Sequence, residues 1–126
     1  MKVDRICAVL PTPSVKNALI FYQSIFTNSE VFYPGDESEY AVLIVDGATS
    51  IHFARVNTML TEERHSLMIF VDDPDAYHDE CIALAVDIDT PLQEAYGLRE
   101  FRIRDNDNRL IVIAKYIGEE SNKTNA

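Results

Sequence analysis

The sequence predicts an α+β fold built from two tandem βαβββ modules. Two stretches point to a duplication, because residues 7–22 and 66–81 each read as a short apolar strand, a helix start and an amphipathic helix. The apolar strand around His52 has a counterpart around Val112 at nearly the same separation. The length of 126 residues, with 47% hydrophobic residues, suits one domain with a substantial core. We therefore expect a single domain over residues 1–117.

The first module is expected over residues 4–57. Ser14 is the expected N-cap of its helix, and the apolar residues that follow have the spacing of one buried helix face. These residues are Val15, Ala18, Leu19, Tyr22, Ile25 and Phe26. Three strands should follow the helix, in the segments "SEVFYP", "EYAVLIV" and "SIHFARV", with a turn at "DGATS" before the last.

The second module is expected over residues 64–117. Asp73 is the expected N-cap, and Pro74 suits the first helical position because its missing N–H is not needed there. The expected buried stripe of this helix is Tyr77, Cys81, Leu84 and Ala85. A strand at "VDID" should precede a loop, and two further strands, "REFRIRD" and "RLIVIAKY", should close the module. Residues 118–126 are polar and are expected to form a frayed tail.

The segment "DNDN", between the last two strands, resembles an acidic metal-binding loop. An EF-hand calcium loop needs glycine at its sixth position and a carboxylate at its twelfth. Counted from Asp105, those positions hold Leu110 and Tyr116. Asn and Asp tolerate the left-handed backbone of tight turns, so we expect a hairpin turn at this segment.

Charge and cysteine content limit the partners. The net charge of −10 disfavours nucleic acid, and it is compatible either with simple solubility or with attraction of a cationic ligand. Cys7 and Cys81 have no CxxC spacing, which favours two free thiols in a reducing compartment. We recognise neither a signal peptide nor an apolar run long enough for a membrane helix, and we therefore expect a cytoplasmic protein.

A duplicated βαβββ unit with these motifs resembles the vicinal oxygen chelate superfamily, which includes glyoxalase I, extradiol dioxygenases, fosfomycin-resistance enzymes and bleomycin-resistance proteins. Its members often close with "YG-x-REF…DP-DG-N", a pattern similar to "YGLREFRIRDNDNRL" here. The matching residues are Tyr96, Gly97, Arg99, Glu100, Phe101, Asp105 and Asp107, whereas Asn106, Asn108 and Arg109 depart from the pattern. The opening "VLPTPSVKNALIFY" looks most similar to the bleomycin-resistance branch. The resemblance implies a U-shaped mixed sheet around a cleft.

The resemblance also implies four positions at which metal-dependent members hold a divalent cation. In this chain they are Cys7, His52, Ser66 and Val112. Ser66 is a poor ligand and Val112 has no donor atom, so Cys7 and His52 alone would remain. His65 could take the place of Ser66 only if a β-bulge shifted the strand by one residue. We expect neither a metal nor another cofactor.

Strand alternation then predicts the residues that line the cleft. They are Cys7, Val9, His52, Ala54, Ser66, Met68, Phe70, Glu100, Arg102, Leu110 and Val112. A mostly apolar lining with a few polar points is typical of a preformed small-molecule pocket. Two alternatives remain open: these residues could fill a closed core, and Glu100 with Arg102 could form a cross-strand pair in a solvated rim.

The resulting hypothesis is a binding protein rather than an enzyme. Members of the bleomycin-resistance branch bind their drug without modifying it, in grooves lined by both subunits of a homodimer. We expect the same of this chain: metal-independent sequestration of a small molecule, with cationic aromatic compounds favoured by the charge, and a homodimer. The alternative is a metal-dependent glyoxalase-like lyase or dioxygenase with an atypical ligand set. Cys7 and His52 could act as a nucleophile and a base, but the sequence shows no third group that would orient the histidine. A degenerate paralogue that acts through protein contacts is also compatible with the sequence.

Overall fold

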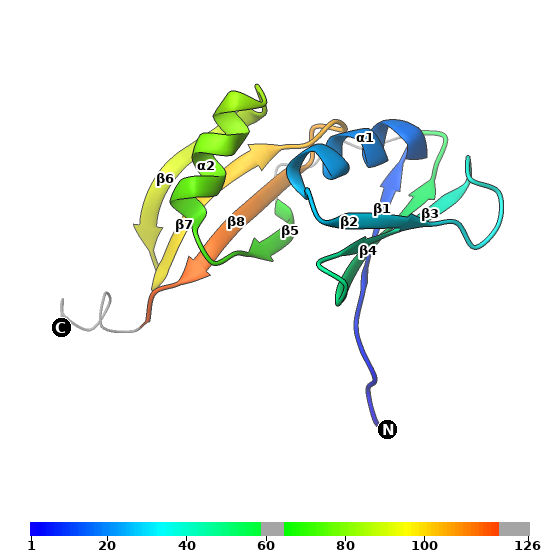
Figure 1. The fold of residues 1–126 in the computed structure, drawn as a ribbon, viewed down its shortest axis with the longest axis horizontal. Helices are drawn as coiled ribbons and strands as arrows, with labels where there is room; N and C mark the ends of the chain where they lie inside the picture. Colours follow the sequence, from blue (N-terminus) through cyan, green and yellow to red (C-terminus); the bar gives the residue numbers. More distant parts are fainter. Residues whose placement is uncertain (59–64, 119–126) are drawn as a thin grey trace. The chain divides into compact units, whose positions relative to one another are not determined.

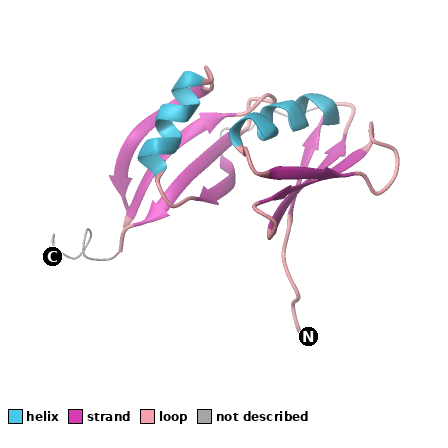
Figure 2. Cartoon of the chain, in the orientation of Figure 1, coloured by secondary structure: helices cyan, strands magenta, loops and turns pink. Residues whose placement is uncertain are grey.

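The computed structural model describes residues 1–58 and 65–118 of the chain. The chain divides into two compact units, Met1–Leu60 and Thr61–Ala126. Each unit is a four-stranded mixed sheet with one helix packed on one of its faces (Figures 1 and 2). This confirms the α+β class and the tandem βαβββ modules, while the single-domain organisation stays a prediction.

The first unit contains four strands and a helix in the order strand–helix–strand–strand–strand. They are β1 (Ala8–Thr12), α1 (Val15–Ile25), β2 (Ser29–Phe32), β3 (Tyr40–Val45) and β4 (Thr49–Arg55). In space the strands run in the order β1-β4-β3-β2, and β1 is parallel to β4 while the other pairs are antiparallel.

Helix α1 forms where its sequence predicts. The Ser14 hydroxyl accepts a hydrogen bond from the Asn17 N–H at 3.1 Å, which satisfies one of the free donors at the start of the helix. All six expected apolar residues are buried. The Tyr22 ring packs against the rings of Phe26 and Phe53, with ring centroids 6.2 and 5.2 Å away. Helix α1 is therefore anchored in the first unit by one face, which carries aromatic and aliphatic side chains.

A tight turn sets how β3 and β4 pair. Asp46 and Gly47 both have positive φ, 52° and 71°, which is typical of a type I′ turn, and the Ala48 N–H donates to the Val45 carbonyl at 3.3 Å. Val45 then lies opposite Thr49, and Tyr40 lies opposite Ala54. Alternation along β3 buries its odd-numbered residues under α1 and leaves Tyr40 and its even-numbered neighbours on the other face.

The second unit repeats this topology. Its elements are β5 (His65–Phe70), α2 (Pro74–Ala83), β6 (Asp87–Ala95), β7 (Leu98–Arg104) and β8 (Leu110–Tyr116). The strand order is β5-β8-β7-β6, with β5 parallel to β8. The pairing of β5 with β8 is irregular between His65 and Leu67.

Strand β6 differs from the sequence expectation, which placed a loop after "VDID". The strand continues to Ala95 and passes through Pro91. Proline is tolerated because β6 is an edge strand and its register shifts on both sides of Thr90. The strand ends at Tyr96 and Gly97, which both have positive φ.

Helix α2 is shorter than its apolar spacing predicts, so Leu84 and Ala85 were wrongly assigned to its buried stripe. Leu84 is the C-cap and is 50% exposed, and Ala85 adopts the left-handed conformation with φ of 59°. The Val86 N–H donates to the Cys81 carbonyl and the Ala85 N–H donates to the Ile82 carbonyl. This is a Schellman motif, which ends the helix.

Few apolar residues anchor α2, and polar contacts hold it on its sheet. The Arg99 guanidinium of β7 donates two hydrogen bonds, each of 3.0 Å, to the two carboxylate oxygens of Asp75. Arg99 thereby lowers the pKa of Asp75. The His78 ring packs edge-on against Phe101, with centroids 5.1 Å apart.

The "DNDN" segment is a hairpin turn, as predicted. Asn108 has φ of 61°, and its N–H donates to the Asp105 carbonyl at 3.0 Å. The Asp105 carboxylate accepts from the N–H groups of Asp107 and Arg109 and, at 2.6 Å, from the Arg109 guanidinium. The side chains of Asp105 and Arg109 are buried, so this acidic segment builds the turn.

No helix within the described residues is long and apolar enough to cross a membrane.

Candidate functional site

The first unit presents an open sheet face on the side away from α1. Val9 on β1 lies directly opposite His52 on β4, and Val42 on β3 lies opposite His52 from the other side. Residues opposite one another in a ladder share a face. Ala54 also lies on this face, since it is two residues from His52 on the same strand. The expected grouping of Val9, His52 and Ala54 on one face is present in the structure.

Tyr40 is the main polar partner of His52. The Tyr40 hydroxyl lies 2.7 Å from His52 Nδ1, and the two rings meet edge to face with centroids 5.6 Å apart. The other ring nitrogen, His52 Nε2, is buried and has no hydrogen-bond partner among the described residues. Nδ1 of the imidazole therefore has a hydrogen-bond partner, whereas Nε2 has none among the described residues.

Cys7 contacts a different polar group. It lies just before β1 and is half-buried, and its Sγ is 3.3 Å from the Ser50 hydroxyl. No hydrogen bond joins Cys7 to His52 within residues 1–58 and 65–118. The two residues are near each other on the sheet, but their arrangement does not form a nucleophile and base.

We call the face of the second unit opposite to α2 its open face; Met68 and Phe70 are exposed on it, whereas Val112 and Glu100 are buried. One row across this sheet contains Met68, Val112 and Arg102, which are directly paired on β5, β8 and β7. The neighbouring row contains Phe70, Ala114 and Glu100. The structure therefore places Met68, Phe70, Glu100, Arg102 and Val112 on one face, as strand alternation predicts.

Glu100 and Arg102 do not form a cross-strand pair in a solvated rim. They lie two residues apart on the same strand, and Glu100 is only 3% exposed. The Arg102 Nε donates to the Glu100 carboxylate at 3.4 Å, which is a long hydrogen bond. Glu100 is therefore a buried carboxylate with a weak cationic partner on the open face.

Some of the predicted cleft residues are buried, and others are exposed. Leu110 and Val112 are buried, whereas Val9, Met68 and Phe70 are exposed. The side chains of His65 and Ser66 lie outside what the structure describes.

The four positions do not fit the divalent cation that the superfamily resemblance implies. Val112 offers no donor atom and is 1% exposed, and Cys7 and His52 each contact a neighbouring hydroxyl. No group of three or more His, Cys, Asp or Glu residues is placed to hold a metal ion among the described residues. Two ligands of different kinds in the first unit are too few for a tight site.

The sequence did not single out Tyr40 or Ser50, although each bonds a candidate residue. A signal for Tyr40 was present, because the Asp46–Gly47 turn fixes the register of β3 against β4 and thereby places Tyr40 beside His52. The hydrogen bond between Ser50 and Cys7 depends on where the chain before β1 lies, and strand patterns do not specify that.

The first unit also contains a groove of about 540 Å³ between α1 and the loop that joins β2 to β3. Lys16, Tyr33 and Arg55 are among its lining residues. None of the predicted cleft residues lines it, so it is separate from the open sheet faces.

Comparison with known proteins shows what the chain is similar to in structure. No protein-family model matches the sequence, and no curated protein matches it. The fosfomycin resistance protein FosX from Listeria monocytogenes matches with a TM-score of 0.78 and 19% identity, over 98% of this chain and 99% of that chain. TioX from Micromonospora sp. ML1 matches with a TM-score of 0.71 and 18% identity, over 90% and 99% of the two chains.

A third match is the bleomycin-binding protein of Streptomyces verticillus, whose structure is a complex with copper(II)-bleomycin. It has a TM-score of 0.71 and 26% identity, and the match covers 91% of this chain and 98% of that chain. These proteins are members of the superfamily that the closing motif resembles. The chain therefore shares its fold with members of the vicinal oxygen chelate superfamily.

Proposed function

We propose that this chain binds a small molecule at the open faces of its sheets, without a metal ion. One observation carries the proposal: the position that would complete the coordination of a metal is filled by Val112, a buried aliphatic side chain between Met68 and Arg102. An aliphatic group cannot bind a cation, and the exposed Met68 beside it can contact an apolar ligand.

The composition of the open faces supports binding. Met68 and Phe70 are exposed on the second unit, and Val9 is exposed on the first. Methionine adapts to ligands of different shapes, and aromatic side chains supply large contact areas. His52 and Glu100 add a small number of polar points, as is typical of small-molecule sites.

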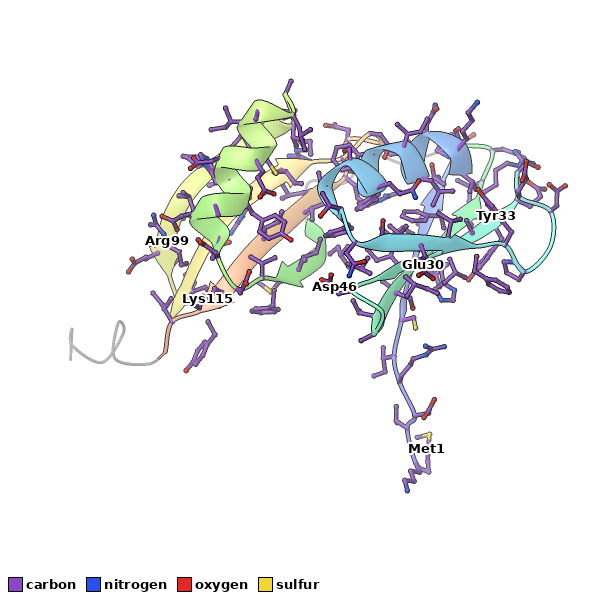
Figure 3. The ribbon with its side chains drawn as sticks, viewed as in Figure 1. Met1, Glu30, Tyr33, Asp46, Arg99 and Lys115 are labelled. Carbon is purple, nitrogen blue, oxygen red and sulfur yellow. The ribbon has the colours of Figure 1, made fainter. Side chains whose placement is uncertain are left out.

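Charge favours a cationic ligand. Glu30 of β2 (labelled in Figure 3) lies opposite Ile44 on the open face of the first unit and is exposed. Together with the net charge of −10, this exposed carboxylate attracts positively charged molecules.

A thermal-shift experiment tests the proposal. Metal-free bleomycin, fosfomycin and a set of cationic aromatic compounds are added to the protein in the presence of a chelator. A ligand that binds only the native state at 100 times its Kd stabilises the protein by about 2.7 kcal/mol and raises Tm. We expect a cationic aromatic compound to raise Tm.

A matched pair of variants controls for overall charge. Glu30→Gln and Glu37→Gln each remove one negative charge at an exposed residue, but Glu37 lies in the loop that lines the separate groove. We expect Glu30→Gln to reduce the Tm shift and Glu37→Gln to leave it unchanged. No Tm shift with any compound, or equal loss in both variants, would contradict the proposal.

A metal-dependent glyoxalase-like lyase or dioxygenase is the second candidate. One observation favours it, since the irregular pairing between His65 and Leu67 is the kind of bulge that a substitute ligand at His65 requires. Retention of one metal ion per chain through dialysis would support this candidate.

A further inference from the structure

The two ring nitrogens of His52 are in different environments. Nδ1 has a short hydrogen bond with the Tyr40 hydroxyl, at 2.7 Å. Nε2 is buried and lacks a partner among the described residues. A buried polar atom without a partner lowers stability, so its presence in a folded protein calls for an explanation.

The side chains that flank His52 on the sheet cannot satisfy Nε2. Val9 and Val42 lie opposite His52 on the two neighbouring strands, and both are aliphatic. Along β4, Ala54 has no polar side-chain atom, and the Ser50 hydroxyl contacts Cys7. The described residues therefore offer no partner for Nε2, and a bound molecule can supply one.

The Tyr40 hydrogen bond determines which nitrogen carries the proton in neutral His52. If Tyr40 donates to Nδ1, Nε2 carries the ring proton and lacks a partner for it within the described residues. If Nδ1–H donates to Tyr40, the Nε2 lone pair lacks a partner instead. The first arrangement is favoured, because a phenol O–H is a stronger donor than a neutral imidazole N–H and an imidazole nitrogen is a stronger acceptor than a phenol oxygen.

We infer that Tyr40 holds His52 as the Nε2–H tautomer and that Nε2–H donates a hydrogen bond to an acceptor oxygen of the bound small molecule. This inference rests on the proposed function and narrows the ligand class. The ligand carries a carbonyl, carboxylate or ether oxygen, in addition to the positive charge favoured by Glu30. Tyr40 is a positioning residue, because it acts through His52.

This tautomer is opposite to the one that a metal ligand needs. A histidine that binds a metal through Nε2 keeps its proton on Nδ1 and donates it to a neighbouring group. Because the two cases differ in the position of a single proton, observing that proton separates ligand binding from metal binding at His52.

Nuclear magnetic resonance of protein with ¹⁵N-labelled imidazole rings provides the first test. The chain has three histidines, and His52→Gln identifies the signals of His52. We expect protonated Nε2 and unprotonated Nδ1 in the wild type at a pH where the ring is neutral. Tyr40→Phe should give a mixture of both tautomers, because it removes the hydroxyl that fixes Nδ1. A protonated Nδ1 in the wild type would overturn the inference, whether or not a ligand binds.

Calorimetric titration with metal-free bleomycin, in the presence of a chelator, provides the second test. His52→Leu should weaken binding about tenfold, which corresponds to the loss of one hydrogen bond. His52→Gln should weaken it less, since the glutamine amide can donate. Glu37→Gln should bind like the wild type. Equal affinity of the wild type and His52→Leu would overturn the inference.

The two tests also separate this inference from the proposed function. Bleomycin binding with protonated Nδ1 would leave the proposed function standing and reject the role of Nε2–H. Absence of binding by the wild type would count against both the proposed function and the ligand contact, while the resonance experiment would still decide the tautomer.

Discussion

Cys7 and Cys81 differ in their surroundings, although both are free thiols. Cys81 is a buried residue of α2, and burial, with a smaller contribution from Glu80, raises its pKa to about 11. Cys7 is half-buried beside the Ser50 hydroxyl. Because the thiolate is the reactive form, the two residues should react at different rates.

We predict that iodoacetamide at pH 8 modifies Cys7 and leaves Cys81 unmodified in the folded protein. Peptide mass spectrometry measures this, and Cys7→Ser should abolish the modification. The raised pKa of Cys81 also means that the unfolded chain loses this proton before the folded chain does, so stability should fall as pH rises from about 9 to about 11. Equal modification of both thiols at pH 8 would contradict this description.

At the residue scale, strand alternation predicted which residues share a sheet face where each strand is regular. It placed Val9 with His52, and Met68 with Val112, on shared faces. It did not predict that Glu100 would be buried, because burial depends on what covers a face and alternation specifies only the face.

Among the elements, α2 ends with an unfavourable residue. Ala85 occupies the left-handed position of the Schellman motif, where glycine has no steric penalty. We predict that Ala85→Gly raises the free energy of unfolding by about 0.5–1 kcal/mol, measured by urea denaturation. Ala83→Gly, inside the same helix, should lower it by about 0.5–1 kcal/mol. Destabilisation by Ala85→Gly would contradict the assigned helix end.

The turn between β7 and β8 depends on one buried carboxylate. Asp105 accepts two backbone N–H groups and the guanidinium of Arg109, whose side chain is also buried. We predict that Asp105→Ala lowers the free energy of unfolding by about 3–5 kcal/mol, because it leaves a buried cation without its partner. Asn106→Ala, at an exposed residue of the same turn, should change stability little. Calcium should stabilise neither the wild type nor Asn106→Ala.

Local sequence signals predicted most elements. The cap at Ser14 and the turns at Asp46 and Asn108 depend on a few adjacent residues, and all three appear where expected. The extension of β6 through Pro91 could not be read locally, because a proline is compatible with a strand only at a sheet edge, and the edge is set by the pairing of distant segments.

At the scale of the whole molecule, two copies of one topology account for the chain. The duplication and the closing motif were sufficient to predict the superfamily fold. The ligand was not predictable to the same degree, because apolar side chains with one imidazole and one carboxylate suit many small molecules.

We predict a homodimer, because the open faces and edges carry exposed apolar side chains. Phe32 on the edge strand β2 is 57% exposed. Light scattering after size exclusion should give twice the mass of the chain. Phe32→Glu should shift the protein toward monomer, whereas Ile20→Glu, at an exposed position of α1, should not. A monomer at all concentrations, or equal effects of both variants, would contradict the dimer.

Metal analysis tests the central claim most directly. Untagged protein is incubated with nickel, zinc, iron(II) or manganese, dialysed, and measured by elemental mass spectrometry beside His52→Leu and His78→Gln. Because Val112 cannot complete a coordination sphere, the wild type should retain far less than one ion per chain. One ion per chain, kept by His78→Gln and lost in His52→Leu, would contradict metal-independent binding.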